Sequence, residues 1–469
     1  MAGSGFRAFI RRVRKGLSSP FPEDADIRRM RREIFAISLP AMTESFLLQL
    51  ASMVNTIMVG SIGTWAISSI GYCNQPRLLL LAVFQAYNVG ATALIAQAKG
   101  AGNHEEANRI VHQSVFFSLC LAGFVAFAGY TFATPMVKYM GANEPLTIAG
   151  ATGYMRYVMI SFPANAISLS ITACLRGIGR TRVSLIYNVV VNLVNMTIGY
   201  LFIRGRFGLP ELGITGASLG MCMGQISGMI ISLSVLLRGA DFLKLRLSRL
   251  FIIDPSILKR VSKVGATAMF DHFFIRFGNI MFVKVATSLG VDMFAAHQIA
   301  MNLLSMSMMN GQSFGIAATS LLGQSVGKKR VDMGKAHVQL CRRYAMYISL
   351  ATGAVMIFFG RQLTAMYTDV PEVIQASARM LIIVGCVQPL HSSQQTLAGA
   401  LRGVGDTKAI ATCTFFTTLI FRPASAWTMV NVLSLGLLGV WIALAMDQVL
   451  RSCYTMWRFS SDEWEKLRL

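Results

Sequence analysis

Acidic residues are scarce in this sequence, and charged residues of every kind are few. Asp and Glu number 21 in 469 residues, and the four charged types together account for only 14% of the chain. Soluble globular proteins carry about 25% charged residues, which cover their surface. Because the hydrophobic share is 54% and the mean hydropathy is +0.55, the composition excludes an ordinary soluble protein and predicts a membrane protein.

The sequence also lacks the patterns of disulfide, metal and nucleotide chemistry. Its eight cysteines are scattered without a CxxC pair, so they predict free thiols. "GQSVGKK" at 323–329 has only three residues between its glycines and no strand before it, which excludes a phosphate loop. No apolar run with a small-residue cleavage site precedes residue 34, so we expect no signal peptide. With no nucleophile–base pattern and no added soluble domain, we expect neither an enzyme nor a cofactor.

Long apolar runs are abundant. A helix needs roughly 20 residues to cross the hydrocarbon layer, and twelve runs have about that length. They lie at about 34–58, 68–98, 110–134, 147–174, 184–204, 213–237, 262–286, 294–322, 344–360, 374–400, 409–431 and 436–457. The sequence therefore predicts an all-α polytopic membrane protein with twelve transmembrane helices.

The basic residues are unevenly distributed between the two sides of this predicted topology. Thirty-three of the 43 Lys and Arg fall in the N-terminal tail, the even-numbered loops and the C-terminal tail, whereas four fall in the odd-numbered loops. By the positive-inside rule, we expect both termini in the cytoplasm and the chain in the inner, cytoplasmic membrane. The net charge of +22 is then explained by the basic residues of the cytoplasmic loops and tails, and it does not indicate a nucleic-acid partner.

One short phrase occurs twice. "LRGIGRTRVS" at 175–184 returns as "LRGVGDTKAI" at 401–410, which is 226 residues later. At the same offset Pro145 matches Pro371, and nearby offsets relate further glycines, glutamines and acids. The chain is therefore predicted to be a duplicated six-helix unit. We interpret the phrase as a cytoplasmic turn after the fourth span of each half, where glycine permits a tight reversal and arginine supplies inside charge, rather than as a substrate contact.

This duplication predicts the domain organisation. We expect a basic cytoplasmic N-tail at 1–32, an N-terminal six-helix bundle at 33–237, a basic cytoplasmic linker at 238–261, a C-terminal six-helix bundle at 262–457 and a cytoplasmic C-tail at 458–469. Two such halves, related by an axis along the membrane normal, are typical of secondary transporters whose sites lie in or between the halves.

Seven stretches of the chain carry a resemblance to a known family. They are "VNTIMVGSIG" (54–63), "GATALIAQAKGAGNHEEANR" (90–109), "LRGIGRTR", "FIRGRFGLPELGITGASLG" (202–220), "AAHQIAMN" (295–302), "LRGVGDTK" and "GLLGVWIALAMDQVLR" (436–451). In this order and spacing the chain resembles the multidrug and toxic compound extrusion (MATE) antiporters. The major facilitator superfamily, which also has twelve spans, typically carries an Asp-Arg-x-Gly-Arg-Arg loop after span two, and "KGAGNHEEANR" does not match it.

The chain departs from MATE proteins at two acidic positions. Many of them carry an aspartate in a Val-Asp-Thr phrase of the first span and another in the fifth span, where this chain has Asn55 and Gly199. Few acids remain inside the predicted spans, and Glu44 and Asp271 occupy equivalent places in the two repeats. A carboxylate at bilayer depth costs at least ~2.5 kcal/mol. We therefore expect Glu44 and Asp271 to couple transport to a cation, the alternative being a hydrogen bond between helices.

Amide and thioether side chains in the spans are candidate substrate contacts. Asn55 lies about three helical turns from Glu44, on the same face of the first span. The methionines and amides of the eighth span suit either a cavity for amphipathic ligands or ordinary helix packing. We expect His297 and His391 to be hydrogen-bonded interior groups, and we expect no metal site. The substrate-binding candidates are Gln49, Asn55, Asn195, Met301, Asn302 and Met308.

The resemblance implies export of organic cations or amphipathic toxic compounds in exchange for a cation. Each half has one acid at mid-depth, and burial favours the protonated form of a carboxyl group, so H⁺ is favoured over Na⁺ as the coupling ion. The alternative is a flippase for a lipid-linked precursor, which predicts a cavity rich in arginine. We expect the partners to be a small-molecule substrate and the lipid bilayer, with the chain a monomer.

Overall fold

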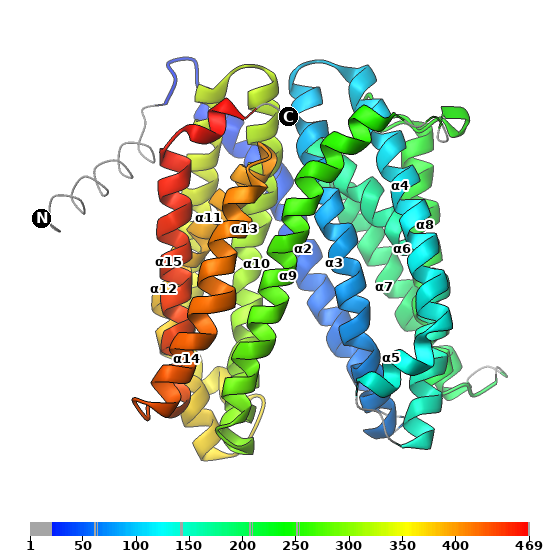
Figure 1. Ribbon diagram of the computed structural model, residues 1–469, viewed down its shortest axis with the longest axis vertical. Coiled ribbons are helices and arrows are strands. Elements are labelled where there is room, and N and C mark those ends of the chain that lie inside the picture. The colour runs from blue at the N-terminus through cyan, green and yellow to red at the C-terminus, as the bar shows by residue number, and fades with distance from the viewer. Residues whose placement is uncertain are drawn as a thin grey trace, which may run out of the picture. The chain divides into compact units, whose positions relative to one another are not determined.

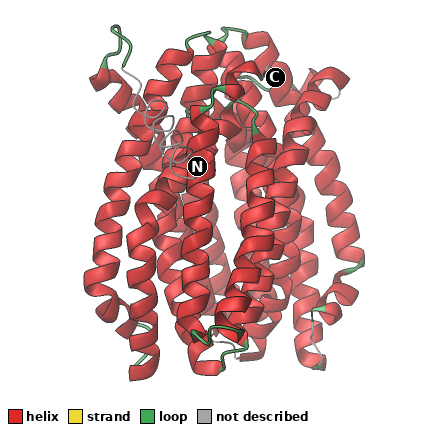
Figure 2. Cartoon of the chain, turned by 60° about the vertical axis from the view of Figure 1, so that its left-hand side comes forward, coloured by secondary structure: helices red, strands yellow, loops and turns green. Residues whose placement is uncertain are grey.

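The protein is built from helices. The computed structural model describes residues 21–60, 62, 64–140, 144–205, 208, 210–249, 252 and 254–467. Across these ranges the chain has long helices and no strand, apart from one isolated β-bridge between Ala240 and Leu243 (Figure 2). Most of the basic tail predicted at 1–32, up to residue 20, lies outside the described residues, as do the last two residues of the predicted C-tail.

Among the described residues of the first half, the chain forms six long helices and one short one. They are α2 (Ile27–Gly60), α3 (Thr64–Gly100), α4 (His104–Thr131), α5 (Ala133–Tyr139), α6 (Pro145–Gly177), α7 (Thr181–Arg204) and α8 (Ile214–Arg238). Figure 1 follows them from blue through cyan to green.

The second half repeats this pattern. After the 3₁₀ turn η2 (Leu247–Arg249) come α9 (Pro255–Thr287), α10 (Val291–Gly327), α11 (Val331–Ala365), α12 (Pro371–Gly403), α13 (Thr407–Thr414), the π-helix η3 (Phe415–Phe421), α14 (Arg422–Asn431), α15 (Gly436–Ser460) and the 3₁₀ turn η4 (Glu463–Lys466). The segments α13, η3 and α14 follow one another without a break, so they occupy one span. Within the described ranges, nine helices are long and apolar enough to cross a membrane by length and composition.

Helix lengths confirm the duplication predicted from the sequence. The helices α6 and α12 both have 33 residues, both begin at proline and both end at glycine. The helices α3 and α10 both have 37 residues, and α8 and α15 both have 25. Two copies of one six-helix unit therefore make up the chain.

The helices assemble into two compact units. The N-unit consists of Thr43–Lys99 and Asn103–Gly265, and the C-unit consists of the residues up to Met42, Gly100–Gly102 and Ala266–Leu469. The division falls inside α2 and α9, so the first turns of α2 belong to the C-unit. There Met30 and Ile34 are fully buried in an apolar core that also contains Phe314 and Leu397.

The duplicated phrase forms the same tight turn in both units. Gly179 and Gly405 have φ of 87° and 85°, a left-handed conformation that glycine adopts without steric cost. The following residues close the turn, since the Arg180 amide donates to the Leu175 carbonyl and the Asp406 amide to the Leu401 carbonyl. The turn predicted from the glycines is therefore confirmed.

A row of glycines brings α7 and α8 close together. Gly216, Gly220, Gly224 and Gly228 recur every four residues on α8. A Cβ added at Gly220 would lie 2.6 Å from the Gly199 amide nitrogen and 2.7 Å from the Asn195 carbonyl. Small residues at this spacing allow two helix backbones to approach. This close packing fixes the position of the asparagines that α7 carries.

Candidate functional site

Glu44 is held in the N-unit by an arginine and an asparagine. Its side chain comes from α2 and the residue is 4% exposed. Arg176, at the end of α6, donates from Nη2 to Glu44 Oε1 at 2.5 Å, and Asn188 of α7 donates to the same oxygen at 2.7 Å. The other oxygen, Oε2, is buried and has no hydrogen-bond partner among the described residues. Three helices thus meet at one carboxylate.

The C-unit repeats this arrangement around Asp271. The residue is 2% exposed and accepts from Arg402 Nη2 at 2.9 Å and from the Thr414 hydroxyl at 2.6 Å. Arg402 and Thr414 each stand 226 positions after their counterparts in the N-unit, which are Arg176 and Asn188. The duplication therefore preserved an acid, its arginine and one neutral donor.

A third buried ion pair lies in the C-unit. Asp447 of α15 is fully buried and accepts from Arg422 Nη2 at 2.6 Å and Nε at 2.9 Å. Arg422 also donates to Asn279 Oδ1 at 2.7 Å, and Thr418 of the π-helix donates to Asp447. The sequence spacing predicts that Asp447 pairs with Arg451 one turn later. That prediction is wrong, because Arg422, the residue that directly follows the π-helix, forms the ion pair with Asp447.

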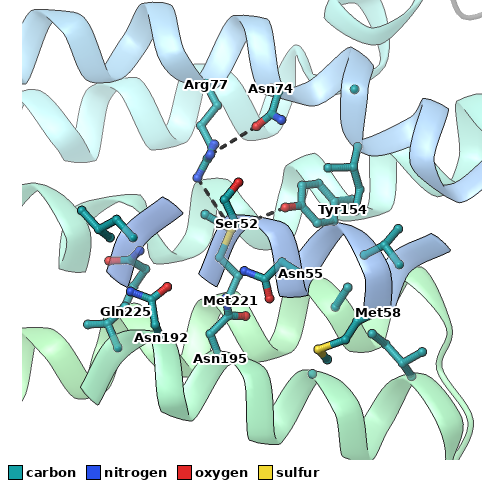
Figure 3. A pocket seen from close by; sticks show the side chains of 18 of the residues that line it. Ser52, Asn55, Met58, Asn74, Arg77, Tyr154, Asn192, Asn195, Met221 and Gln225 are labelled. Atoms are coloured by element: carbon teal, nitrogen blue, oxygen red, sulfur yellow. Dashed lines mark hydrogen bonds between the residues drawn. The ribbon is translucent and has the colours of Figure 1, made fainter. Parts of the chain in front are cut away.

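The N-unit contains a cavity of about 410 Å³. Residues from α2, α3, α6, α7 and α8 line it, and its wall combines amides with apolar side chains. The amides are Asn55, Asn74, Asn188, Asn192, Asn195 and Gln225. Figure 3 shows the amides of Asn192, Asn195 and Gln225 together on one side of this space. A site of this size and mixed character fits a small amphipathic molecule.

One arginine lies in the cavity wall. Arg77 of α3 donates to Asn74 Oδ1 at 3.2 Å and contacts the Met221 sulfur at 3.9 Å. The Tyr154 hydroxyl reaches the same sulfur at 3.5 Å, as Figure 3 shows. None of the described residues that line the cavity is Asp or Glu, so Arg77 carries the one formal charge among them.

Asn188 connects the buried carboxylate to the cavity. It lines the cavity, and its side-chain amide donates to Glu44. The same amide also donates to the Ser184 carbonyl at 3.1 Å, one turn earlier on α7. A change at Glu44 therefore reaches the cavity wall through a single side chain.

Comparison with known proteins settles the family. The MatE family model matches residues 40–201 and again residues 268–428, which together are well over half of the chain. The chain belongs to the MatE family. The double match coincides with the two repeats, and it confirms the resemblance drawn from the sequence.

Individual relatives agree with this assignment over nearly the full length. The chain is 29% identical over 461 residues to a probable multidrug resistance protein NorM of Thermotoga maritima, with 97% of each chain covered. It superposes with a TM-score of 0.86, at 20% identity, on a multidrug resistance MATE family transporter solved in an outward-facing conformation, covering 93% of this chain and 97% of the other. A second structure is a MOP superfamily transporter from Pyrococcus furiosus described as having a binding pocket of reverse polarity; its TM-score is 0.85 at 20% identity, with 94% and 97% covered. These matches confirm the all-α, polytopic, two-bundle fold expected from the sequence.

The predicted substrate contacts of this MatE protein fall in different places. Asn55 and Asn195 line the cavity of the N-unit. Gln49 is half-buried on α2, one turn before the lining residue Ser52. Met301 and Met308 pack against the apolar core of the C-unit, which agrees with the packing alternative, and Asn302 is exposed on α10.

The two histidines singled out in the sequence differ from each other. His391 is buried with its Nε2 3.4 Å from the Gln395 amide. His297 is fully buried, but neither of its ring nitrogens has a hydrogen-bond partner among the described residues. The rings of Phe282, Phe294 and Trp441 surround it instead. The expectation of a hydrogen-bonded His297 was wrong, because aromatic residues from three helices fill the space around it.

Sequence reasoning missed the partners of the two acids. Arg176 and Arg402 were interpreted as topological charge at a turn, and Arg77 received no role. The acid and the arginine recur in both repeats at nearly the same offset. That joint recurrence could have predicted that the two side chains form a pair. In the part of the chain that the structure describes, no group of three or more His, Cys, Asp or Glu side chains is placed to hold a metal ion.

Proposed function

We propose that the chain is a secondary active antiporter that exports amphipathic organic compounds in exchange for protons. It would lie in the inner membrane as a monomer with both termini in the cytoplasm. The six-helix halves at 33–237 and 262–457 would alternate access to the site, as in other duplicated transporters. Its kinship with a NorM-type multidrug resistance protein supports efflux as the direction of transport.

The contact between Glu44 and Asn188 carries this proposal. In its charged form Glu44 attracts Arg176 and accepts from Asn188. A proton on Glu44 would remove that attraction and turn one carboxylate oxygen into a donor. Glu44 Oε1 would then be a neutral acceptor that holds Asn188 less strongly, so Asn188 could turn toward the cavity that it lines. Proton binding and substrate binding would thus act on the same side chain.

The groups around the two acids favour H⁺ over Na⁺. A sodium ion needs several converging oxygen atoms, usually including unwound backbone carbonyls. The groups that meet Glu44 are an arginine and an amide N–H, and those that meet Asp271 are an arginine and a hydroxyl donor. These N–H and O–H groups stabilise a bare carboxylate by donating to it. A proton can bind the carboxylate in their place without further oxygen ligands, whereas a sodium ion needs several.

The cavity favours the amphipathic part of the expected substrate range over organic cations. The described part of its wall offers apolar side chains and neutral amides, and it contains no carboxylate of the kind that a cation would need. The flippase alternative predicts an arginine-rich cavity, whereas the described residues that line this cavity include one arginine, Arg77. A small amphipathic substrate therefore fits better than a lipid-linked pyrophosphate.

Uptake into inverted membrane vesicles tests the proposal. Vesicles containing the protein are given either a pH gradient without sodium or a sodium gradient at equal pH, and accumulation of a panel of fluorescent amphiphiles is followed. We expect accumulation driven by the pH gradient and abolished by a protonophore. Accumulation with the sodium gradient alone would overturn proton coupling, and none under either gradient would overturn the antiporter assignment.

A further inference from the structure

The cavity of the N-unit carries a positive charge that no described residue of its wall balances. Among the lining residues that the structure describes, Arg77 is the one charged side chain, and the six amides are neutral. An uncompensated charge inside a protein is costly unless a partner of opposite sign is supplied. The partner must therefore come from a bound molecule or from solvent.

Arg77 differs in this respect from the other arginines of the buried clusters. Arg176, Arg402 and Arg422 each lie within 3 Å of a carboxylate oxygen. Arg77 has no carboxylate within ion-pair distance among the described residues, and its protein contacts are one amide oxygen and one thioether sulfur. Its Nε is buried without a hydrogen-bond partner. The guanidinium thus keeps an unused donor, and Arg77 is a lining residue of the cavity.

Glu44 does not neutralise Arg77. Glu44 is the acid that Asn188 connects to the cavity wall, but it forms its own ion pair with Arg176 at 2.5 Å. Arg77, Arg176 and Glu44 together carry a net charge of +1. The electrostatic preference of the cavity is therefore for an anion.

We propose that this cavity binds amphipathic organic anions with a single carboxylate, which the Arg77 guanidinium contacts directly. The aliphatic and thioether side chains of the wall would bury the apolar body of the ligand, and the amides would hydrogen-bond its polar substituents. The proposal rests on the proposed function only in taking this cavity as the substrate site. An inside-negative membrane potential would assist export of such a substrate, because it expels anions.

A matched series of ligands tests the charge preference without any transport. Purified full-length protein is titrated with pyrenebutanoate, its neutral methyl ester and the cation pyrenebutyltrimethylammonium, and energy transfer from protein tryptophan to pyrene reports binding. We expect the carboxylate to bind at least tenfold more tightly than the ester, and the cation to bind most weakly. Equal or tighter binding of the ester or the cation would overturn the proposal.

Two arginine variants assign the preference to Arg77. Loss of a charged hydrogen bond in Arg77→Gln is expected to weaken carboxylate binding about 10- to 100-fold and to leave ester binding unchanged. Arg77→Lys retains the charge and is expected to recover part of the affinity. Arg156→Gln is the matched control, since Arg156 lies on α6 of the same unit, is exposed, and stacks over Tyr130. Equal loss for carboxylate and ester in Arg77→Gln would indicate a packing role for Arg77 and contradict the proposal.

A charge reversal provides a test that does not depend on removing Arg77. Asn55 lines the same cavity, and Asn55→Asp replaces an amide with a carboxylate of the same size. We expect this variant to lose its preference for pyrenebutanoate and to gain affinity for the pyrenebutyl cation. An unchanged order of affinities would contradict the proposal. Anion binding without gradient-driven transport would contradict only the proposed function, whereas transport of the cation in preference to the anion would contradict only this inference.

Discussion

Glu44 and Asp271 each receive an arginine and one neutral donor in a nearly solvent-free position. Buried ion pairs of this kind are weak evidence for stability, because desolvation of the two charges cancels much of their attraction. Their presence in both repeats is better explained by a need for a carboxylate that can change its charge. The neutral donor differs between the copies, since Asn188 lines the cavity of the N-unit and the equivalent residue of the C-unit is Thr414.

Glu44→Gln is expected to stop transport while the protein still folds. The glutamine side-chain oxygen can accept from both Arg176 and Asn188, so the contacts survive, but the amide cannot bind and release a proton. Efflux driven by a pH gradient should fall at least tenfold, measured in vesicles with equal amounts of protein. Glu105→Gln is the control, because Glu105 is an exposed acid that pairs with Arg109 on α4 and should leave efflux unchanged. Full efflux by Glu44→Gln would remove Glu44 from the coupling mechanism.

Asp271→Asn is expected to impair export through the C-unit. The asparagine oxygen can still accept from Arg402 and its NH2 group can donate to the Thr414 hydroxyl oxygen, but the side chain at position 271 then stays uncharged. Because Asp271 lies in the C-unit and is not among the described residues that line the N-unit cavity, we expect kcat to fall severalfold and KM for the substrate to change little. The exposed Asp292 at the start of α10 provides the control variant Asp292→Asn. Unchanged kcat and KM in Asp271→Asn would leave Asp271 with a packing role.

At the scale of elements, the glycine row of α8 sets the geometry of the cavity. Asn192 and Asn195 line the cavity from α7, and Gln225 lines it from α8. These side chains keep their positions only while the two backbones stay close. Helix packing at backbone distance therefore positions the amides of the binding site.

Gly220→Ala is expected to destabilise the protein by about 1–3 kcal/mol, because the new Cβ would meet the backbone of α7 at Gly199 and Asn195. Gly153→Ala is the matched control, since a Cβ added there has open space within 4 Å. Thermal unfolding in detergent compares the two variants, and Gly220→Ala should have the lower Tm. Equal Tm values would show that α7 and α8 separate without cost.

Apolar periodicity predicted the elements well and their contacts poorly. The spans predicted at 147–174 and 374–400 lie inside α6 and α12, whose lengths are equal. The span predicted at 409–431 contains the π-helix η3, which no apolar pattern indicates. Arg422 directly follows this π-helix and donates to Asp447. The π-helix therefore explains why the predicted pairing of Asp447 with Arg451 was wrong. Hydropathy locates a helix, but it does not specify which side chains of other helices will meet it.

At the scale of the whole molecule, duplication was predictable and the composition of the compact units was not. Matching residues at offsets of 226 or close to it predicted the number of halves and the equivalence of Glu44 with Asp271. The sequence placed the domain boundary between helices, whereas the first turns of α2 pack in the C-unit with Phe314. Which helices share a core depends on tertiary packing that pairwise repeats do not encode. The cavity of the N-unit was indicated only in part, through Asn55 and Asn195.

Proton movement during substrate exchange tests proton coupling through Glu44 most directly. Proteoliposomes are loaded with substrate and an internal pH dye, at equal pH on both sides and without sodium, and are then diluted into substrate-free buffer. We expect substrate leaving the vesicles to draw protons inward, so the lumen acidifies with wild-type protein and not with Glu44→Gln. Substrate efflux through the wild-type protein without any change in internal pH, or efflux that requires sodium, would contradict proton coupling through Glu44.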